Sequence, residues 1–321
     1  MNTRLKNILK KTLPLLLGVF LIGYSYSITS ADDRKNIVEA IKGADYFWVV
    51  ISLLLGFMSH FFRAVRWNLL LKPLGYQPRL INNIMAIFAA YLANLGIPRS
   101  GELLRATTIS TYENIPFQKG FGTIIAERVI DVILLLLIVA ITAILQTEII
   151  FDYFAAKQIN FNKLIGIGIV LLIAGALFLF FIKKAKSGFL LKIKHIVQGL
   201  IEGVSSVFQM KNKGLFIIYT LAIWFLYIAM FWVVKFSIPE TVNLPVSAIL
   251  AAFVAGAFAM TATNGGIGLY PIAVSNILLI YGVSKTTGDA FGWIMWSSQT
   301  IMIVLFGALS FLFLPIFNKN K

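Results

Sequence analysis

The chain of 321 residues is 59% hydrophobic and only 13% charged, with a mean hydropathy of +0.86, far above the apolar share of a typical soluble domain. In a soluble protein the formal net charge of +15 would suggest nucleic acid, but here Lys and Arg lie between long apolar runs, so we expect contact with anionic lipid headgroups and no nucleic-acid partner. The chain contains no cysteine, which excludes disulfides and thiolate chemistry.

Six apolar runs approach or exceed the roughly 20 residues that a helix needs to cross the hydrocarbon core. They lie at 13–29, 46–71, 124–146, 163–182, 214–236 and 290–316. The first run has no small-residue cleavage site, so we interpret it as a retained span and not as a signal peptide. The sequence therefore predicts an all-α, polytopic integral membrane protein with about six full spans.

Two further apolar segments, 81–97 and 246–281, are interrupted by Gly and Pro. The first runs into the polar stretch NLGIPRSGELLRA (94–106), and the second contains TNGGIGLYP (263–271). Irregular backbone at membrane depth must be buried in protein or line a wet cavity. We therefore expect two interrupted or re-entrant helical elements; the alternative is that Gly and Pro merely kink two ordinary spans.

The two breaks occupy matching places in the two halves of the chain, where Asn94-Leu-Gly96-Ile97 aligns with Asn264-Gly-Gly266-Ile267. Each half holds an odd number of full spans, so the halves have opposite orientations. Inverted repeats with discontinuous helices are typical of secondary transporters, whose substrate sites lie at the breaks. We expect one membrane domain, 1–321, made of inverted repeats at about 1–160 and 161–321. A net crossing by either interrupted element would remove this symmetry.

Most Lys and Arg residues lie in segments that fall on one side if neither interrupted element crosses the membrane. The positive-inside rule makes that side cytoplasmic. We therefore expect a bacterial cytoplasmic (inner) membrane protein with both termini in the cytoplasm. The Lys-rich segment 183–213 has apolar residues at helical spacing and is expected to be an amphipathic helix on the inner leaflet.

Four arginines are candidates for binding an anionic headgroup, because ionisable residues at membrane depth are expensive and Arg binds phosphate in bidentate fashion. Arg63 and Arg66 share one face of the span 46–71, and Arg99 and Arg105 lie in the polar stretch after the first break. For Arg66, snorkelling to the interface is an alternative.

Three carboxylates are expected to orient these arginines. Glu127 and Asp131 are four residues apart, beside Arg128, and Glu102 lies after the first break. There Ser100 is expected to cap a helix that has Glu102 in its first turn. The alternative for the charged residues is a structural ion-pair network that binds no substrate.

The second break offers backbone amides and hydroxyl groups but no charge, so we expect it to form an outer gate. Its residues are Asn264, Gly265, Gly266, Gly268 and Tyr270. No catalytic group, metal site or cofactor is expected, because the two histidines, His60 and His195, lie far apart without cysteine and no phosphate-binding loop is present. We expect His60 to be hydrogen-bonded to a neighbouring span.

Several of these motifs together resemble the transmembrane, flippase-like region of the lysylphosphatidylglycerol synthase family. They are Arg66-Trp67, Pro98 to Arg105, Glu127-Arg128 with Asp131, and Asn264 to Gly268. The last motif often reads PGG-x-G in the family, and here Asn264 replaces the Pro. Full-length synthases continue into a soluble domain that transfers lysine from lysyl-tRNA to phosphatidylglycerol. This chain ends at Lys321, after its last span, so the resemblance implies a stand-alone member without that aminoacyltransferase domain.

The arginines and the resemblance together predict a non-enzymatic lipid flippase or transporter. The substrate class is an anionic (phospho)lipid, such as lysylphosphatidylglycerol or a polyprenyl-phosphate-linked lipid. One alternative is a non-transporting membrane partner that presents lipid to a separate aminoacyl- or glycosyltransferase. Another is a membrane-embedded transferase with Glu127 or Asp131 as base, which no nucleophile or metal constellation accompanies.

Overall fold

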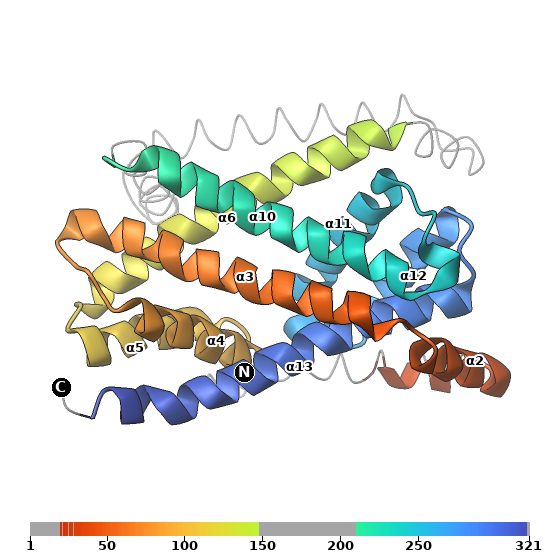
Figure 1. The fold of residues 1–321 in the computed structure, drawn as a ribbon, viewed down its shortest axis with the longest axis horizontal. Helices are drawn as coiled ribbons and strands as arrows, with labels where there is room; N and C mark the ends of the chain where they lie inside the picture. The colour runs from red at the N-terminus through yellow and green to blue at the C-terminus, as the bar shows by residue number, and fades with distance from the viewer. Residues whose placement is uncertain (1–19, 21, 25, 28, 148–209, 320–321) are drawn as a thin grey trace, which may run out of the picture. The chain divides into compact units, whose positions relative to one another are not determined.

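The computed structural model describes residues 20, 22–24, 26–27, 29–147 and 210–319, and every regular element in these ranges is a helix (Figure 1). The chain forms two compact units. The main unit combines Met1–Ile124 with Asn212–Lys321, and the second unit is Ile125–Lys211. The expected span 163–182 lies outside the described residues, and the span 13–29 and the amphipathic segment 183–213 lie mostly outside them.

Four helices are long and apolar enough to cross a membrane, and they confirm four of the expected spans. They are α3 (Tyr46–Leu71), α6 (Phe117–Leu145), α10 (Lys213–Val234) and α13 (Lys285–Phe317). Helix α6 begins seven residues before the expected 124, and α13 five residues before the expected 290, because a helix continues for as long as its backbone is paired and does not stop where its side chains become polar.

Four shorter helices lie at the two interrupted segments. They are α4 (Leu80–Gly96), α5 (Ser100–Glu113), α11 (Val246–Ala262) and α12 (Leu269–Ile280). Helix α4 coincides with the expected 81–97 and α5 follows its break, whereas α11 and α12 make up the expected 246–281. At 1.5 Å per residue each is about 18–26 Å long, shorter than the roughly 30 Å hydrocarbon core. In Figure 1, α4 and α5 lie beside one end of the long helices of the main unit, and α11 and α12 lie beside the other end.

Within each pair the two helices pack closely, because a glycine stands where they touch. A Cβ on Gly101 of α5 would lie 2.3 Å from the carbonyl oxygen of Ala90 in α4. A Cβ on Gly256 of α11 would lie 2.8 Å from Cε2 of Tyr270 in α12. Both distances are shorter than van der Waals contact, so a larger side chain at Gly101 would push the backbone of α4 away, and one at Gly256 would displace the ring of Tyr270.

Polar side chains cap the N-termini of several helices. Ser30 accepts from the N–H of Asp33 at the start of α2 (Ala31–Lys42), Asp45 caps α3, and Ser284 caps α13. Each satisfies a backbone donor that the first helical turn leaves unpaired. Short 3₁₀ turns are η1 (Lys72–Leu74), η2 (Lys235–Ser237), η3 (Pro239–Thr241) and η4 (Asn264–Gly266).

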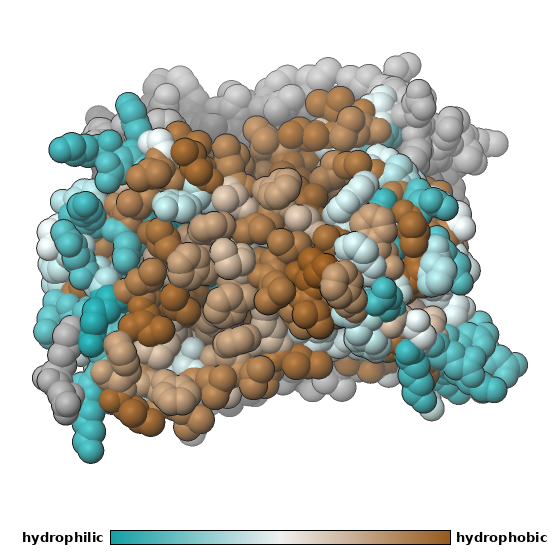
Figure 2. All heavy atoms as spheres, viewed as in Figure 1, coloured by the Kyte–Doolittle hydropathy of each residue, from teal (hydrophilic) through white to brown (hydrophobic). Residues whose placement is uncertain are grey.

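The long helices of the main unit carry large apolar side chains on their surface. Leu54 is 61% exposed, Phe225 70% and Ile301 65%. On the face in Figure 2, hydrophobic residues cover the middle of α3, α10 and α13, and hydrophilic residues gather toward their ends. A surface of this kind is expected where lipid tails, and not water, surround the protein.

Candidate functional site

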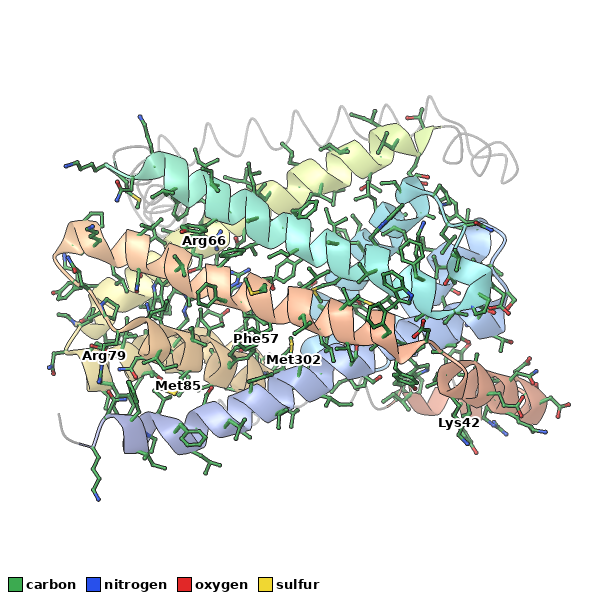
Figure 3. The ribbon with its side chains drawn as sticks, viewed as in Figure 1. Lys42, Phe57, Arg66, Arg79, Met85 and Met302 are labelled. Atoms are coloured by element: carbon green, nitrogen blue, oxygen red, sulfur yellow. The ribbon has the colours of Figure 1, made fainter. Side chains whose placement is uncertain are left out.

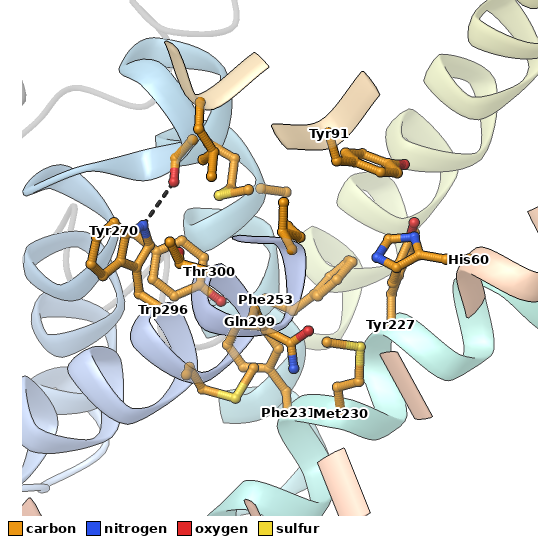
Figure 4. Close-up of a pocket in the computed structure, with 16 residues that line it drawn as sticks. His60, Tyr91, Tyr227, Met230, Phe231, Phe253, Tyr270, Trp296, Gln299 and Thr300 are labelled. Carbon is orange, nitrogen blue, oxygen red and sulfur yellow. Dashed lines mark hydrogen bonds between the residues drawn. The ribbon is translucent and has the colours of Figure 1, made fainter. Parts of the chain in front are cut away.

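A cavity of about 190 Å³ lies inside the main unit, where α3, α4, α10 and the α11–α12 pair meet α13 (Figure 4). Its walls are largely aromatic and aliphatic. Six lining residues are polar: His60, Tyr91, Tyr227, Tyr270, Gln299 and Thr300. Among the described residues that line it, none is Asp, Glu, Lys or Arg. The cavity therefore suits an apolar or uncharged polar group.

The cavity lies near the middle of the long helices. His60 is about 21 Å from the start of α3 and about 17 Å from its end, and Gln299 is about 21 Å from the start of α13, at 1.5 Å per residue. Both side chains line the cavity. The cavity therefore lies near the middle of both long helices, and not at their ends.

The turns of the two helix pairs meet at this cavity. Leu95, near the end of α4, and Gly265, in the turn between α11 and α12, both line it. The side chain of Leu95 packs on Gly265. The indole N–H of Trp296 in α13 donates to the carbonyl oxygen of Gly265 at 2.7 Å (Figure 4). The two breaks that the sequence aligned are thus neighbours in space.

Several buried polar atoms at the cavity have no hydrogen-bond partner among the described residues. They include Nδ1 of His60, Nε2 of Gln299, and both side-chain polar atoms of the adjacent Asn264. The expected hydrogen bond of His60 to a neighbouring span is therefore wrong: its ring packs against the rings of Tyr91 and Phe88 instead. A buried polar atom without a partner costs about 1–3 kcal/mol, so a ligand or water that pairs with these atoms gains that free energy.

Arg63 lies directly behind one wall of the cavity. Its guanidinium donates to the hydroxyl of Tyr227 at 3.2 Å, and Tyr227 lines the cavity. The side chain is only 3% exposed. The guanidinium therefore lies behind Tyr227, within hydrogen-bond distance of a hydroxyl group that lines the cavity.

Arg66 is held inside the protein. It is 0% exposed, donates to Oγ1 of Thr220 at 3.1 Å, and lies 5.5 Å from the ring of Phe216. The alternative that Arg66 snorkels to the interface is therefore wrong, because α10 supplies the acceptor and the aromatic face that keep the guanidinium inside.

Arg105 reaches the same region from α5. Its guanidinium lies 3.7 Å above the ring of Trp67, a geometry that favours a cation–π interaction. Trp67 is itself fixed by a hydrogen bond from its indole N–H to Oγ1 of Thr123 at 2.9 Å. The structure thus places Arg105 beside the Arg66-Trp67 pair, which the sequence could connect only through the family resemblance.

Arg99 differs from the other three arginines. It is exposed, has a positive φ of 60°, and occupies the turn between α4 and α5. The expected cap by Ser100 is wrong: the Ser100 hydroxyl donates back to the carbonyl oxygens of Ala93 and Ile97. Oδ1 of Asn94 accepts from the N–H of Gly101 at 2.7 Å instead, because the turn brings the end of α4 beside the start of α5.

The three carboxylates occupy two different helices. Glu102 lies in the first turn of α5, as expected. Glu127 and Asp131 are buried on α6, within the second unit, and their i,i+4 spacing puts them on one face of that helix. Their orienting of the arginines stays a prediction. The described residues contain no group of His, Cys, Asp or Glu that could hold a metal ion.

The second break has a backbone that only glycine adopts easily. Gly265, Gly266 and Gly268 have φ values of 59°, 77° and 72°, in the left-handed region that costs other residues about 1–2 kcal/mol. Asn264 and Tyr270 are buried, at 3% and 7% exposed. Gating by this turn stays a prediction.

The family model described as the lysylphosphatidylglycerol synthase TM region matches residues 12–307. The chain belongs to this family. No solved structure matches it significantly.

The curated relatives cover parts of the chain. It is 29% identical over 102 residues to the glycosyltransferase AglD of Haloferax volcanii, a match that covers 32% of this chain and 16% of that protein. It is 26% identical over 142 residues to a UPF0104 membrane protein of Methanothermobacter thermautotrophicus, covering 44% of this chain and 39% of the relative. The matched region of another UPF0104 membrane protein, from Methanocaldococcus jannaschii, is 25% identical and covers 37% of it. The chain thus spans less than half the length of each of these relatives.

Proposed function

We propose that this family member binds an anionic lipid and moves its headgroup across the bilayer. The observation that carries the proposal is the cavity near the middle of the long helices, at which the turns of the two helix pairs meet. In transporters, discontinuous helices at matching positions of two repeats form the substrate site. The α4–α5 and α11–α12 pairs are the elements that inverted repeats would relate, and an inner-membrane location with both termini in the cytoplasm is part of the proposal.

The route of the headgroup follows from where the charges lie. Arg99 is exposed at the turn before α5 and is the first arginine that a phosphate would meet. Arg63 lies behind Tyr227 at the cavity, where it would attract the phosphate inward. The unpartnered Nε2 of Gln299 and Nδ1 of His60 would pair with the uncharged part of the headgroup. The lipid tails would stay in the bilayer, because the cavity is too small to enclose them.

The test measures transbilayer movement of a labelled anionic phospholipid in proteoliposomes that contain only this protein. We expect Arg63→Gln and Arg99→Ala each to reduce the rate at least tenfold, and Lys72→Gln, at an exposed cation outside the pairs, to leave it unchanged. Each variant is checked for a wild-type thermal unfolding midpoint. An unchanged rate after replacement of both Arg99 and Arg105 would show that these arginines do not bind the headgroup.

The match to AglD favours one second candidate, because part of this chain resembles part of a glycosyltransferase. In this role the protein holds a lipid for a separate transferase and does not move it. The two roles predict different results for the purified protein in liposomes: a flippase moves lipid alone, and a presenting partner binds lipid without moving it. Lipid mass spectrometry of the purified protein identifies the bound class in both cases.

A further inference from the structure

A second hollow lies apart from the central cavity, between α4 and α13. It has a volume of about 430 Å³. Its floor is buried and consists of Met85, Phe88 and Ser310, and its outer edges are exposed, with Phe313 52% and Ile81 42% accessible. We call this hollow the α4–α13 groove. It opens onto the surface of the main unit.

The groove offers no polar atom that needs a partner. Nine of its ten lining residues are apolar, and the tenth, Ser310, donates its hydroxyl to the carbonyl oxygen of Phe306 at 2.7 Å. A surface of this kind contrasts with the central cavity and its unpartnered amide and imidazole atoms. Hydrocarbon is therefore the chemistry that fits the groove.

Three aromatic rings close the inner end of the groove. Phe57, Phe88 and Phe306 lie 5.0–5.5 Å apart, centroid to centroid. On the other side of this cluster, His60 of the central cavity meets Phe88 edge-on at 5.2 Å. The three rings thus close the groove near the middle of α3 and separate it from the central cavity.

The length of the groove matches one leaflet. From Phe317 to Phe306 along α13 the rise is about 17 Å, and half of the roughly 30 Å hydrocarbon core is about 15 Å. Figure 3 shows Arg79, Met85 and Phe57 in that order from the end of the helices toward their middle. A chain in the groove would run from the interface to the midplane, as an acyl chain does.

The interfacial end of the groove presents a cation. The guanidinium of Arg79 lies 4.7 Å from the ring of Phe317, a lining residue. Its Nε contacts Glu113 at 3.2 Å and its Nη2 donates to Asn318, whereas Nη1 has no hydrogen bond to a described residue. The Arg79 side chain is 37% exposed but that of Glu113 only 6%. Arg79, the positive member of this pair, is therefore the one that is exposed at the surface. A second cation, the exposed Lys319, follows Asn318 in the chain.

We propose that the α4–α13 groove is a binding site for an anionic phospholipid, with one acyl chain along the groove and the phosphate at Nη1 of Arg79. This site is distinct from the central cavity and does not require that the protein transport lipid. Glu113 and Asn318 act as positioning residues, because they fix the plane of the guanidinium that faces the phosphate.

The absence of cysteine allows a direct test in the full chain. A single cysteine is introduced at Leu309, on the edge of the groove, and labelled with bimane. The matched control is Ala308→Cys, one residue away at the same depth, exposed and on the other side of α13. Each protein is placed in phosphatidylcholine vesicles that contain increasing fractions of phosphatidylglycerol with brominated acyl chains, which quench bimane on contact.

A specific site predicts that quenching at position 309 saturates at a several-fold lower fraction of brominated lipid than quenching at position 308. Arg79→Gln should bring the two curves together, and Arg79→Lys, which keeps the charge, should keep them apart. Brominated phosphatidylcholine should show no difference between the positions. Equal curves for brominated phosphatidylglycerol in the wild-type background would overturn the proposal, since the groove would then hold only bulk lipid.

The outcome is independent of lipid transport. If flux fails in proteoliposomes but the curves differ, the groove site stands and the proposed function falls. If lipid flux is present and the two quenching curves coincide, the proposed function stands and the groove site falls. Because Arg79→Gln removes several contacts at once, Ser310→Phe supplies a second variant that fills the floor of the groove without changing charge, and it should also abolish the difference.

Discussion

A Cβ built on Gly265 would lie 2.4 Å from Cδ2 of Leu95, so the turn of the second helix pair touches the end of α4 with no room for a methyl group. These two residues are far apart in the sequence and belong to opposite halves of the chain. Their contact joins the two interrupted elements beside the central cavity.

Gly265→Ala is expected to destabilise the main unit for two reasons. Its φ of 59° costs a non-glycine residue about 1–2 kcal/mol, and the new methyl group collides with Leu95. Gly282→Ala is the matched control, because Gly282 has a φ of 81° and nothing within 4 Å of its Cβ position. Thermal unfolding in detergent should give a larger loss for Gly265→Ala. Equal losses would mean that backbone strain alone matters.

Asn94→Ala should weaken the α4–α5 pair by about 1 kcal/mol, the usual cost of a lost helix cap. The substitution removes the oxygen that accepts from the N–H of Gly101 at 2.7 Å. Asn94→Asp keeps an acceptor in place and adds a negative charge at a helix N-terminus, so it should retain wild-type stability. Unfolding midpoints of the three proteins provide the comparison, and a midpoint for the Ala variant equal to wild type would contradict it.

Thr123→Val should destabilise the protein by about 1–3 kcal/mol, since the buried indole N–H of Trp67 loses its acceptor while side-chain volume is nearly unchanged. Arg105 stacks on the same ring, so we also expect greater mobility of that guanidinium. Thr123→Ser keeps the hydroxyl and serves as the control. Denaturation followed by tryptophan fluorescence reports the difference.

Asn264→Leu separates stability from function. Both polar atoms of Asn264 are buried without a partner among the described residues, so an apolar side chain should leave stability unchanged or raise it by about 1 kcal/mol. If Asn264 pairs with the headgroup, the rate of lipid movement should fall at least tenfold. Asn276→Leu, at an exposed position on α12, should change neither quantity. A stable Asn264→Leu variant with wild-type flux would remove Asn264 from the site.

Much of the fold follows from hydropathy alone. The span 46–71 coincides with α3, α4 ends at Gly96 within the predicted break 94–106, and α11 ends at Ala262, directly before the predicted break 263–271. These features are local: a long apolar run makes a helix, and Gly and Pro mark where it ends. The family also follows from short motifs, as the match over residues 12–307 confirms.

The errors concern side chains whose partners lie on other helices. Ser100 bonds backward to α4 because the α4–α5 pair folds at that point. Arg66 is buried because Thr220 of α10 accepts from it. His60 lacks a partner because aromatic rings surround it. The signal that could have marked His60 as a site residue was its place: a lone histidine near the middle of a long apolar helix.

By itself, then, the sequence determined that this chain is a helical membrane protein of the lysylphosphatidylglycerol synthase TM family with two breaks between apolar helices, because these properties depend on runs of residues and their order. Only the tertiary structure decided that the breaks meet at a common cavity, that Arg105 stacks on Trp67, and that a separate groove ends at Arg79. Such contacts join residues from distant parts of the chain, and they are set by which helices pack together, a choice that no local pattern encodes.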